Sequence, residues 1–239
     1  MSPFTFFAAA TVMAAGAAVQ GSVGFGAALV AAPLLALIDP TFVPAPLILA
    51  ALILNILMLR RERGSHLWRA VAWPIAGQIP GALMGAGLLA LAADDHVLGV
   101  VFGAMILVAV ALSISGLRAE PTPPVLFAAG SLSGVMQSTV GAGGPPIALA
   151  LQGRSGPDLR AALARYFTVS CLVSLGFLVA VGQVGGRELV DAAVLLPGAV
   201  VGFLASGWVS RHVDGVVARR SVLILSAIAA LAVLARSLA

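Results

Sequence analysis

Long apolar runs alternate with short polar stretches along almost the entire chain. Most of these runs are close to the length of about 20 residues that an α-helix needs to cross a bilayer. The polar stretches between them are too short to fold alone, so the sequence predicts an all-α membrane protein with about eight hydrophobic helical segments and no soluble domain. The runs cover residues 4–38, 42–59, 70–91, 96–117, 124–152, 159–182, 190–210 and 219–238.

Two of the runs, 4–38 and 124–152, are too long for one comfortable crossing, and each has a glycine-rich middle. When each residue is aligned with the residue 117 positions later, both runs show the pattern Q-x-[ST]-V-G-x-G. We interpret this match as an internal duplication with halves at residues 1–119 and 120–239, a design that recurs in secondary transporters. The match pairs Gln20, Ser22, Val23, Gly24 and Gly26 with Gln137, Thr139, Val140, Gly141 and Gly143.

The distribution of the arginines predicts the orientation of the two halves. All 13 basic residues are arginine, and they gather between the apolar runs. If every run crosses once, the arginines divide almost evenly between the two sides. If 4–38 and 124–152 each enter and return as a broken or re-entrant hairpin, eleven arginines face one side and two the other, as the positive-inside rule prefers. This arrangement gives two inverted repeats, with the 60–69 loop in the cytoplasm.

The composition supports the membrane assignment and narrows the chemistry. Hydrophobic residues make up 61% of the chain and charged residues only 9%, whereas a soluble globule carries about 25% charge. The net charge of +4 lies in short loops, so we expect no nucleic-acid partner. Cys171 is the single cysteine, which leaves no intrachain disulfide or thiolate metal site. Because the chain has no Walker A or zinc-protease motif, we expect no enzyme activity, catalytic residue, cofactor or metal.

The glycine-rich middles of the two long runs are the candidate functional sites. Backbone that is broken at membrane depth leaves polar groups unpaired, and it is tolerated where it lines a cavity. Hydroxyl, amide and backbone N–H donors beside a helix start can bind an anion without a buried positive charge. Alternatively, these small residues only allow close helix packing. The candidate substrate-binding residues are Gln20, Ser22, Gly24, Phe25, Gly26, Gln137, Ser138, Thr139, Gly141, Gly143 and Gly144.

Three further polar residues inside apolar runs are possible path-lining residues. Asn55 and Gln78 could line a transport path, but amide side chains also form hydrogen bonds between membrane helices. Arg165 could attract an anion, or it could extend to the lipid headgroups. The sequence leaves both alternatives open for each residue.

The two glycine-rich segments resemble those of the sulfite exporter TauE/SafE family. The resemblance rests on VQGSVGFGAALVAAPLLALI, GVMQSTVGAGGPPIALAL and the later RxxLARYF, and it covers essentially the whole chain. It implies a carrier of the bacterial or archaeal inner membrane that moves sulfite, sulfonates or other small sulfur-containing anions, with the substrate at the two glycine-rich segments. The family often has a longer glycine string in the first segment, which Phe25 and Ala27 interrupt here.

The sequence and the resemblance together predict a multi-pass secondary transporter that exports a small sulfur-containing anion by alternating access. Its partners would be that anion and the lipid bilayer. Two alternatives are an anion channel, which could use the same donors, and a non-transporting membrane assembly protein, in which the glycines only pack helices. The anion, the ion coupling and the oligomeric state are not encoded in any pattern that we can interpret.

Overall fold

The computed structural model describes residues 2–62, 67–91, 95–117, 120–212 and 215–238, and the regular structure of these residues is entirely helical. The predicted all-α class is therefore confirmed. The elements are α1 (Pro3–Val23), α2 (Ala27–Ile38), the 3-10 turn η1 (Pro40–Phe42), α3 (Ala45–Arg61), α4 (Trp68–Leu91), α5 (Asp95–Ile114), α6 (Pro123–Val140), α7 (Gly144–Ala150), α8 (Gly156–Ala180), α9 (Gly186–His212) and α10 (Gly215–Leu238).

Each of the two long apolar runs is divided into two helices by a glycine. Helix α1 ends at Gly24 (φ 103°) and helix α6 ends at Gly141 (φ 75°), both in the left-handed conformation that glycine adopts without steric cost. The helices that follow are short, with 12 residues in α2 and seven in α7. At 1.5 Å per residue these helices are only about 18 and 10 Å long, which is less than the thickness of the hydrocarbon core.

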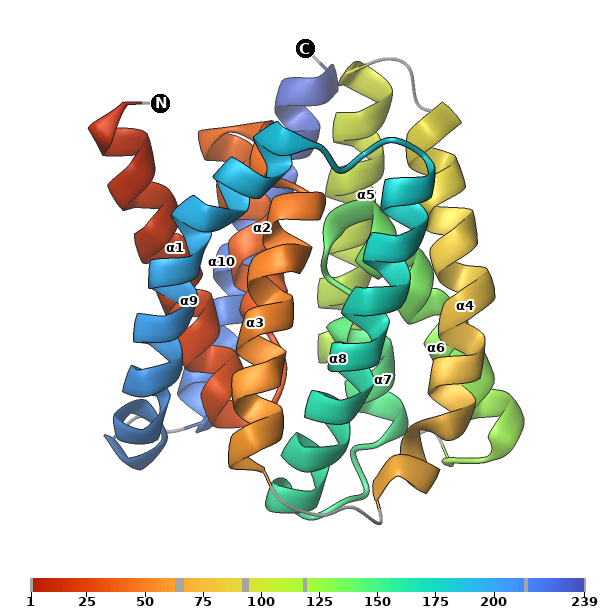
Figure 1. Ribbon diagram of the computed structural model, residues 1–239. Helices are drawn as coiled ribbons and strands as arrows, with labels where there is room; N and C mark the ends of the chain where they lie inside the picture. Colours follow the sequence, from red (N-terminus) through yellow and green to blue (C-terminus); the bar gives the residue numbers. More distant parts are fainter. Residues whose placement is uncertain (1, 63–66, 92–94, 118–119, 213–214, 239) are drawn as a thin grey trace.

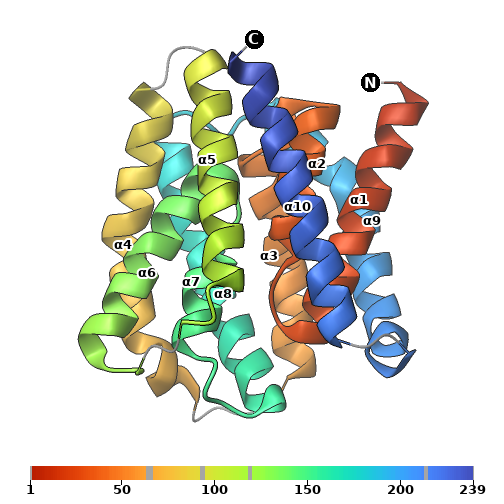
Figure 2. The same cartoon turned by 180° about the vertical axis from the view of Figure 1, so that it is seen from behind.

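The helices that open the two predicted halves run in opposite directions. In Figure 1, α1 descends from the end of the bundle that carries the N-terminus, whereas α6 ascends from the other end; Figure 2 shows the same from behind. The C-terminal ends of α3, α5, α7 and α9 all lie at this second end. We call it the arginine-rich end, because the helix turns and the described connecting residues here include Arg60, Arg61, Arg69, Arg154, Arg160 and Arg211.

The connection predicted at residues 60–69 is shorter than expected. Helix α3 continues through Arg61 and α4 begins at Trp68, so the two arginines that open this segment belong to the last turn of a helix. Cations there interact favourably with the helix dipole, which favours continuing the helix through them. Residues 63–66 of the predicted loop lie outside the described residues.

Two helix pairs, α1 with α9 and α4 with α6, are in the closest contact in the molecule. In the first pair, Gly198 of α9 faces the backbone carbonyl oxygen of Ala10. In the second pair, Gly81 of α4 faces the carbonyl oxygen of Ser131. A methyl group at either glycine would overlap that oxygen, so the close approach requires glycine.

The outer faces of the helices are strongly apolar. Leu83 of α4, Leu204 of α9 and Ile228 of α10 are 55%, 72% and 61% exposed. Within the described residues, α1, α4, α8, α9 and residues 97–114 of α5 are long and apolar enough to cross a bilayer. Such faces would be unstable in water but suit lipid, and the chain is therefore a multi-pass membrane protein.

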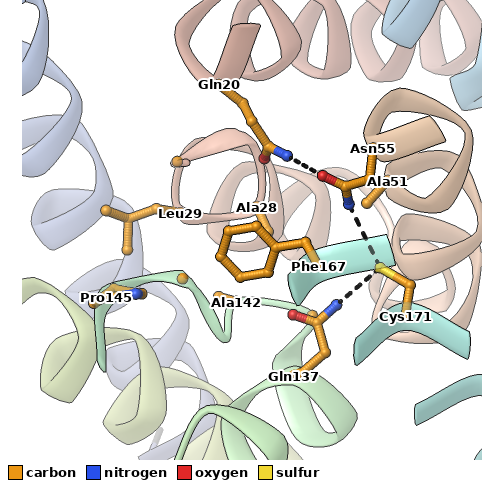
Figure 3. Close-up of a pocket in the computed structure, with 13 residues that line it drawn as sticks. Gln20, Ala28, Leu29, Ala51, Asn55, Gln137, Ala142, Pro145, Phe167 and Cys171 are labelled. Atoms are coloured by element: carbon orange, nitrogen blue, oxygen red, sulfur yellow. Dashed lines mark hydrogen bonds between the residues drawn. The ribbon is translucent and has the colours of Figure 1, made fainter. Parts of the chain in front are cut away.

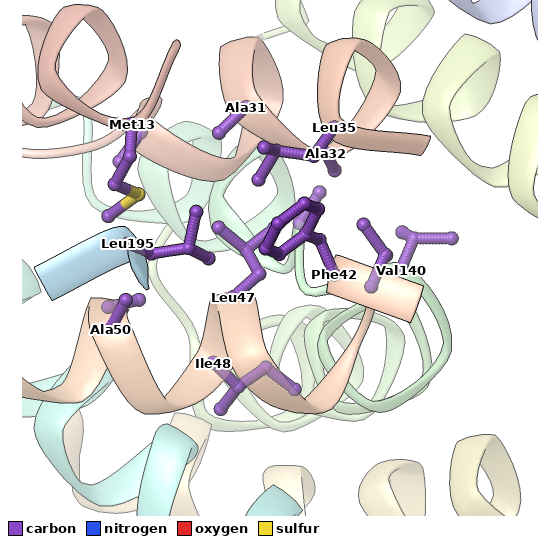
Figure 4. Packing of buried hydrophobic residues seen from close by; sticks show 14 of the residues in the cluster. Met13, Ala31, Ala32, Leu35, Phe42, Leu47, Ile48, Ala50, Val140 and Leu195 are labelled. Carbon is purple, nitrogen blue, oxygen red and sulfur yellow. The ribbon is translucent and has the colours of Figure 1, made fainter. Parts of the chain in front are cut away.

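A buried apolar cluster around η1 holds the first broken helix in place. Phe42 is completely buried and packs among Ala31, Ala32 and Leu47, from the helices on either side of η1 (Figure 4). Val140, the last residue of α6, lies in the same cluster. Residues of both predicted halves share this core. The end of α6 is therefore packed in the same cluster as α2 and η1.

Candidate functional site

A small pocket lies where the two breaks meet (Figure 3). In this structure it has room for about one water molecule. Its walls come from α2, α3 and α8 as well as from the two breaks, and no charged side chain is among the described residues that form them. The lining residues are Gln20, Gly26, Ala28, Leu29, Ala51, Asn55, Gln137, Gly141, Ala142, Gly144, Pro145, Phe167 and Cys171.

The backbone at the breaks depends on glycine for two different reasons. Gly26, like Gly24 and Gly141, has a positive φ angle, here 112°, which glycine adopts without steric cost. Gly143 has an ordinary φ of −75°. A Cβ atom at Gly143 would lie 2.6 Å from the carbonyl oxygen of Ser133, so this glycine is required for close approach. The hydroxyl of Ser133 donates to the Gly143 carbonyl oxygen at 2.5 Å and fixes the second break against α6.

The two matched glutamines stabilise the two breaks in the same way. The Oε1 atom of Gln20 accepts a hydrogen bond from the N–H of Ala27, the first residue of α2, at 3.2 Å. The Oε1 atom of Gln137 accepts from the N–H of Gly143, the N-cap residue of α7, at 3.1 Å. Each side chain therefore satisfies a backbone donor that the break leaves outside any helical hydrogen bond.

The amide groups of the glutamines point to the second helix after each break, α3 for Gln20 and α8 for Gln137. Gln20 Nε2 donates to Asn55 Oδ1 of α3 at 2.7 Å, and Gln137 Nε2 donates to Cys171 Sγ of α8 at 3.7 Å. Asn55 Nδ2 also donates to Cys171 Sγ, again at 3.7 Å, so a continuous chain of contacts joins the two glutamines (Figure 3). Asn55 and Cys171 are 116 positions apart, close to the offset of 117 between the glutamines, and this spacing is the sequence signal that could have identified Cys171.

Three predicted hydroxyl donors are directed away from the pocket. Ser22 donates to the carbonyl oxygens of Ala18 and Ser206 at 2.8 and 3.1 Å, between α1 and α9. Thr139 is fully buried and donates to the carbonyl oxygen of Val135 at 2.8 Å. Ser138 Oγ lies 3.0 Å from the hydroxyl of a serine in α8 and belongs to a separate network.

The remaining predicted residues lie around the pocket at different distances from its walls. A Cβ atom at Gly24 would lie 3.1 Å from the side chain of Arg160 in α8. A Cβ atom at Gly144 would lie 3.4 Å from the ring of Phe25, so the first break lies close to the second. Gly141 lines the pocket, whereas Gly24, Phe25 and Gly143 do not.

The three possible path-lining residues occupy different places. Asn55 lines the pocket. Gln78 is completely buried in the separate network, where it donates to Ser174 Oγ at 3.1 Å and accepts from Tyr166 Oη at 2.7 Å. Arg165 is buried outside the pocket, donates to the carbonyl oxygen of Ala161 at 2.6 Å and lies over the ring of Trp68.

A charged cluster closes the arginine-rich end beneath the first break. Arg61 donates to the carbonyl oxygen of Gly21 and, at 2.9 Å, to Ser206 Oγ, which attaches the end of α1 to α3 and α9. Glu62 accepts from Arg61 at 3.3 Å and from Arg160 of α8 at 3.1 Å. The cluster therefore links helices of both predicted halves on one side of the uncharged pocket.

Broken helices that meet at a buried polar pocket, inside a bundle of membrane-crossing helices, are an architecture that recurs among membrane transporters. The family model described as "Sulfite exporter TauE/SafE" matches residues 8–233 of the chain. The chain belongs to this family, a family of membrane transporters, and the resemblance predicted from the sequence is confirmed. No curated protein and no solved structure was found to match the chain.

Proposed function

We propose that this protein is a secondary carrier that exports a small sulfur-containing anion, sulfite or an organosulfonate, by alternating access around the pocket at the two breaks. The observation that carries the proposal is the meeting of Gln20, Asn55 and Gln137 at this pocket, together with membership of the sulfite exporter family. These amides offer N–H donors from both halves of the chain. An oxyanion needs several such donors at once.

Donors without charge suit an anion that must also leave the site. A buried arginine would bind the anion strongly and would be expensive to hold in the membrane. The first turn of α2 adds the backbone N–H groups of Ala28 and Leu29, which no earlier helical carbonyl can accept. A helix N-terminus stabilises an anion by up to about 2 kcal/mol in a partly buried setting. The combination gives moderate attraction, as a carrier requires.

We further propose that residues 1–119 and 120–239 are inverted repeats. The opposite directions of α1 and α6 support this assignment. The packing supports it as well, because α1 contacts α9 while α6 contacts α4, the reciprocal pair under an exchange of halves. In an inverted repeat each half can close one side of a central site in turn. The present pocket is too small for sulfite, so binding requires the surrounding helices to separate.

The concentration of arginines at one end of the bundle supports a location in the bacterial inner membrane with the arginine-rich end in the cytoplasm. Under this assignment the cluster of Arg61, Glu62 and Arg160 faces the cytoplasm, and anions that approach from that side meet positive charge first. The anion then reaches the uncharged pocket once the side chains of this cluster rearrange.

The test is anion flux into proteoliposomes that contain the purified protein, with sulfite, thiosulfate, sulfate and small sulfonates as the panel. We expect flux of one or more sulfur anions and its loss in the Gln20→Ala/Gln137→Ala double variant. The matched control is Gln152→Ala/Gln183→Ala, which removes two exposed glutamines outside the pocket. No flux for any member of the panel, from protein shown to be folded, would overturn the proposal.

Counterflow separates a carrier from an anion channel. Proteoliposomes loaded with unlabelled substrate are diluted into labelled substrate, and a carrier then accumulates label transiently above equilibrium. A channel does not. Absence of accumulation in vesicles with normal flux would replace the carrier by the channel, which could use the same donors.

A further inference from the structure

Two amide donors from opposite halves of the chain are directed at one weak acceptor. Asn55 Nδ2 and Gln137 Nε2 both lie 3.7 Å from Cys171 Sγ (Figure 3). A thiol sulfur accepts hydrogen bonds poorly. All three side chains are nearly inaccessible to solvent, with exposures of 2% for Asn55, 4% for Gln137 and 1% for Cys171. Two buried amides therefore have their N–H groups in only weak hydrogen bonds at the edge of the pocket.

The orientation of both amides is fixed by their oxygen atoms. Asn55 Oδ1 accepts from Gln20 Nε2 at 2.7 Å, and Gln137 Oε1 accepts from the N–H of Gly143 at 3.1 Å. Rotating either amide by 180° would bring two donors or two acceptors together. The N–H groups are consequently held toward Cys171 and the pocket before any ligand arrives, and prior ordering of this kind lowers the entropy lost on binding.

We propose that Asn55 and Gln137 form the oxyanion-binding pair of the carrier, and that Cys171 sets its affinity by acting as a weak, displaceable acceptor. The inference rests on the proposed function of the pocket. An anionic oxygen forms hydrogen bonds roughly twice as strong as those between neutral groups, so it competes successfully with the thiol for both amides. A stronger internal acceptor would compete with the substrate.

The roles of the two glutamines differ under this assignment. Gln137 contacts the anion directly. Gln20 is a positioning residue, because its amide is already in a short hydrogen bond to Asn55 Oδ1 and holds that side chain in place. Phe167, Ala142 and Leu29 supply the apolar remainder of the pocket. The ligand class is therefore a small anion that presents one oxygen to the amide pair and its less polar side to these residues.

The experiment compares Cys171→Ser with Cys171→Ala in sulfite uptake by proteoliposomes. A serine oxygen is the better acceptor, and we expect Cys171→Ser to raise the half-saturation concentration about fivefold, with the maximal rate little changed. Cys171→Ala removes the competing acceptor, so half-saturation should fall, by about twofold. Ser174→Ala is the control, because Ser174 is a buried polar residue on the same helix that does not line the pocket.

Opposite shifts for the serine and alanine variants support the assignment, since a purely packing role would move both in the same direction. Equal shifts, or none, in variants with wild-type maximal flux would overturn the role of Cys171 and leave the carrier intact. A second readout is the rise in melting temperature that sulfite gives the purified protein, which we expect to be lost in Asn55→Leu and retained in Ser174→Ala. If the wild type shows neither flux nor stabilisation by sulfite, the proposed function fails and the inference fails with it.

Discussion

The break between α1 and α2 and the break between α6 and α7 share a geometry but differ in chemistry. Both begin at a left-handed glycine, and both are stabilised by a glutamine that accepts from the chain beyond the break. The first glutamine then donates to Asn55, whereas the second donates to Cys171. The first break opens a helix of 12 residues, and the second opens one of seven.

The supply of backbone donors differs even more. The first turn of α2 is Ala27, Ala28 and Leu29, and all three have N–H groups. The first turn of α7 contains Pro145 and Pro146, which have none. The pocket therefore has a donor-rich wall from the first break and a stiffer, donor-poor wall from the second. The shared geometry maintains the breaks, while the unequal chemistry leaves the free backbone N–H donors mainly on one side of the pocket.

The largest expected effect tests whether the two close helix pairs are equivalent. Gly81→Val and Gly198→Val each place a side chain against a carbonyl oxygen of the partner helix, and we expect each to lower the free energy of unfolding by about 3 kcal/mol or to prevent folding. The measurement is the melting temperature in detergent. Gly87→Val on α4 and Gly207→Val on α9, where no neighbouring atom lies within 4 Å, are matched controls. One variant as stable as its control would show that the two pairs are unequal.

A smaller effect is expected at the left-handed glycines of the two breaks. Gly24→Ala and Gly141→Ala should each cost about 1–2 kcal/mol, because a Cβ atom disfavours this conformation, and should abolish most flux. Gly182→Ala is the control, since Gly182 also has a positive φ, 77°, but has open space around it. We expect the control to lose similar stability and keep its flux. Normal flux in either break variant would argue that the site does not depend on that break.

Separate removal of the glutamines sharpens the difference between the halves. Each Gln→Ala change removes a backbone cap and should lower stability by about 1 kcal/mol. In sulfite uptake, we expect Gln137→Ala to raise the half-saturation concentration about tenfold and Gln20→Ala about threefold, because only Gln137 is assigned to contact the anion. Gln183→Ala is the control. A larger effect at Gln20 would reverse the assigned roles.

The smallest effect is expected at the ion pair between the halves. Glu62 bonds Arg160 at 3.1 Å, but the Arg160 side chain is 30% exposed, and pairs of this kind contribute at most about 1 kcal/mol. Position 178, which is 116 residues after Glu62, is a leucine, so the equivalent position in the second half has no carboxylate. Melting temperatures of Glu62→Gln, Arg160→Gln and the double variant measure the coupling, which should decrease at high salt. Coupling well above this range would identify a stronger link between the halves.

The sequence was sufficient to predict the positions of the breaks because two physical requirements coincide there. A run such as 4–38 exceeds the thickness of a bilayer, and its glycines supply the conformations that end and restart a helix. The matched glutamines then marked the centre of the site. Gln20 and Gln137 do line the pocket, together with Gly26, Gly141 and Gly144. Whether these residues bind substrate remains a prediction.

The positions of the hydroxyls could not be predicted without the helix ends. Helix α1 continues to Val23 and α6 to Val140, so each break begins after the motif's hydroxyl. Residues two apart on a helix point about 200° apart, which places Ser22 on the face opposite Gln20. Thr139 is related to Gln137 in the same way. Cys171 was not assigned to the site, because its one sequence signal, the offset of 116 positions from Asn55, indicates a role only once Asn55 is known to line the pocket.

The close pairing of α1 with α9 has a consequence for how the protein is made. Helix α1 is complete at residue 23, but its partner begins only at Gly186, so α1 enters the membrane long before the glycines of α9 exist. At typical synthesis rates of about 5–20 residues per second, this interval is roughly ten to thirty seconds. The newly inserted first helix must spend that time against lipid or against an insertion factor. Final assembly of the bundle is therefore an event of late translation, and a ribosome that stalls before α9 leaves a chain whose first helix has no partner.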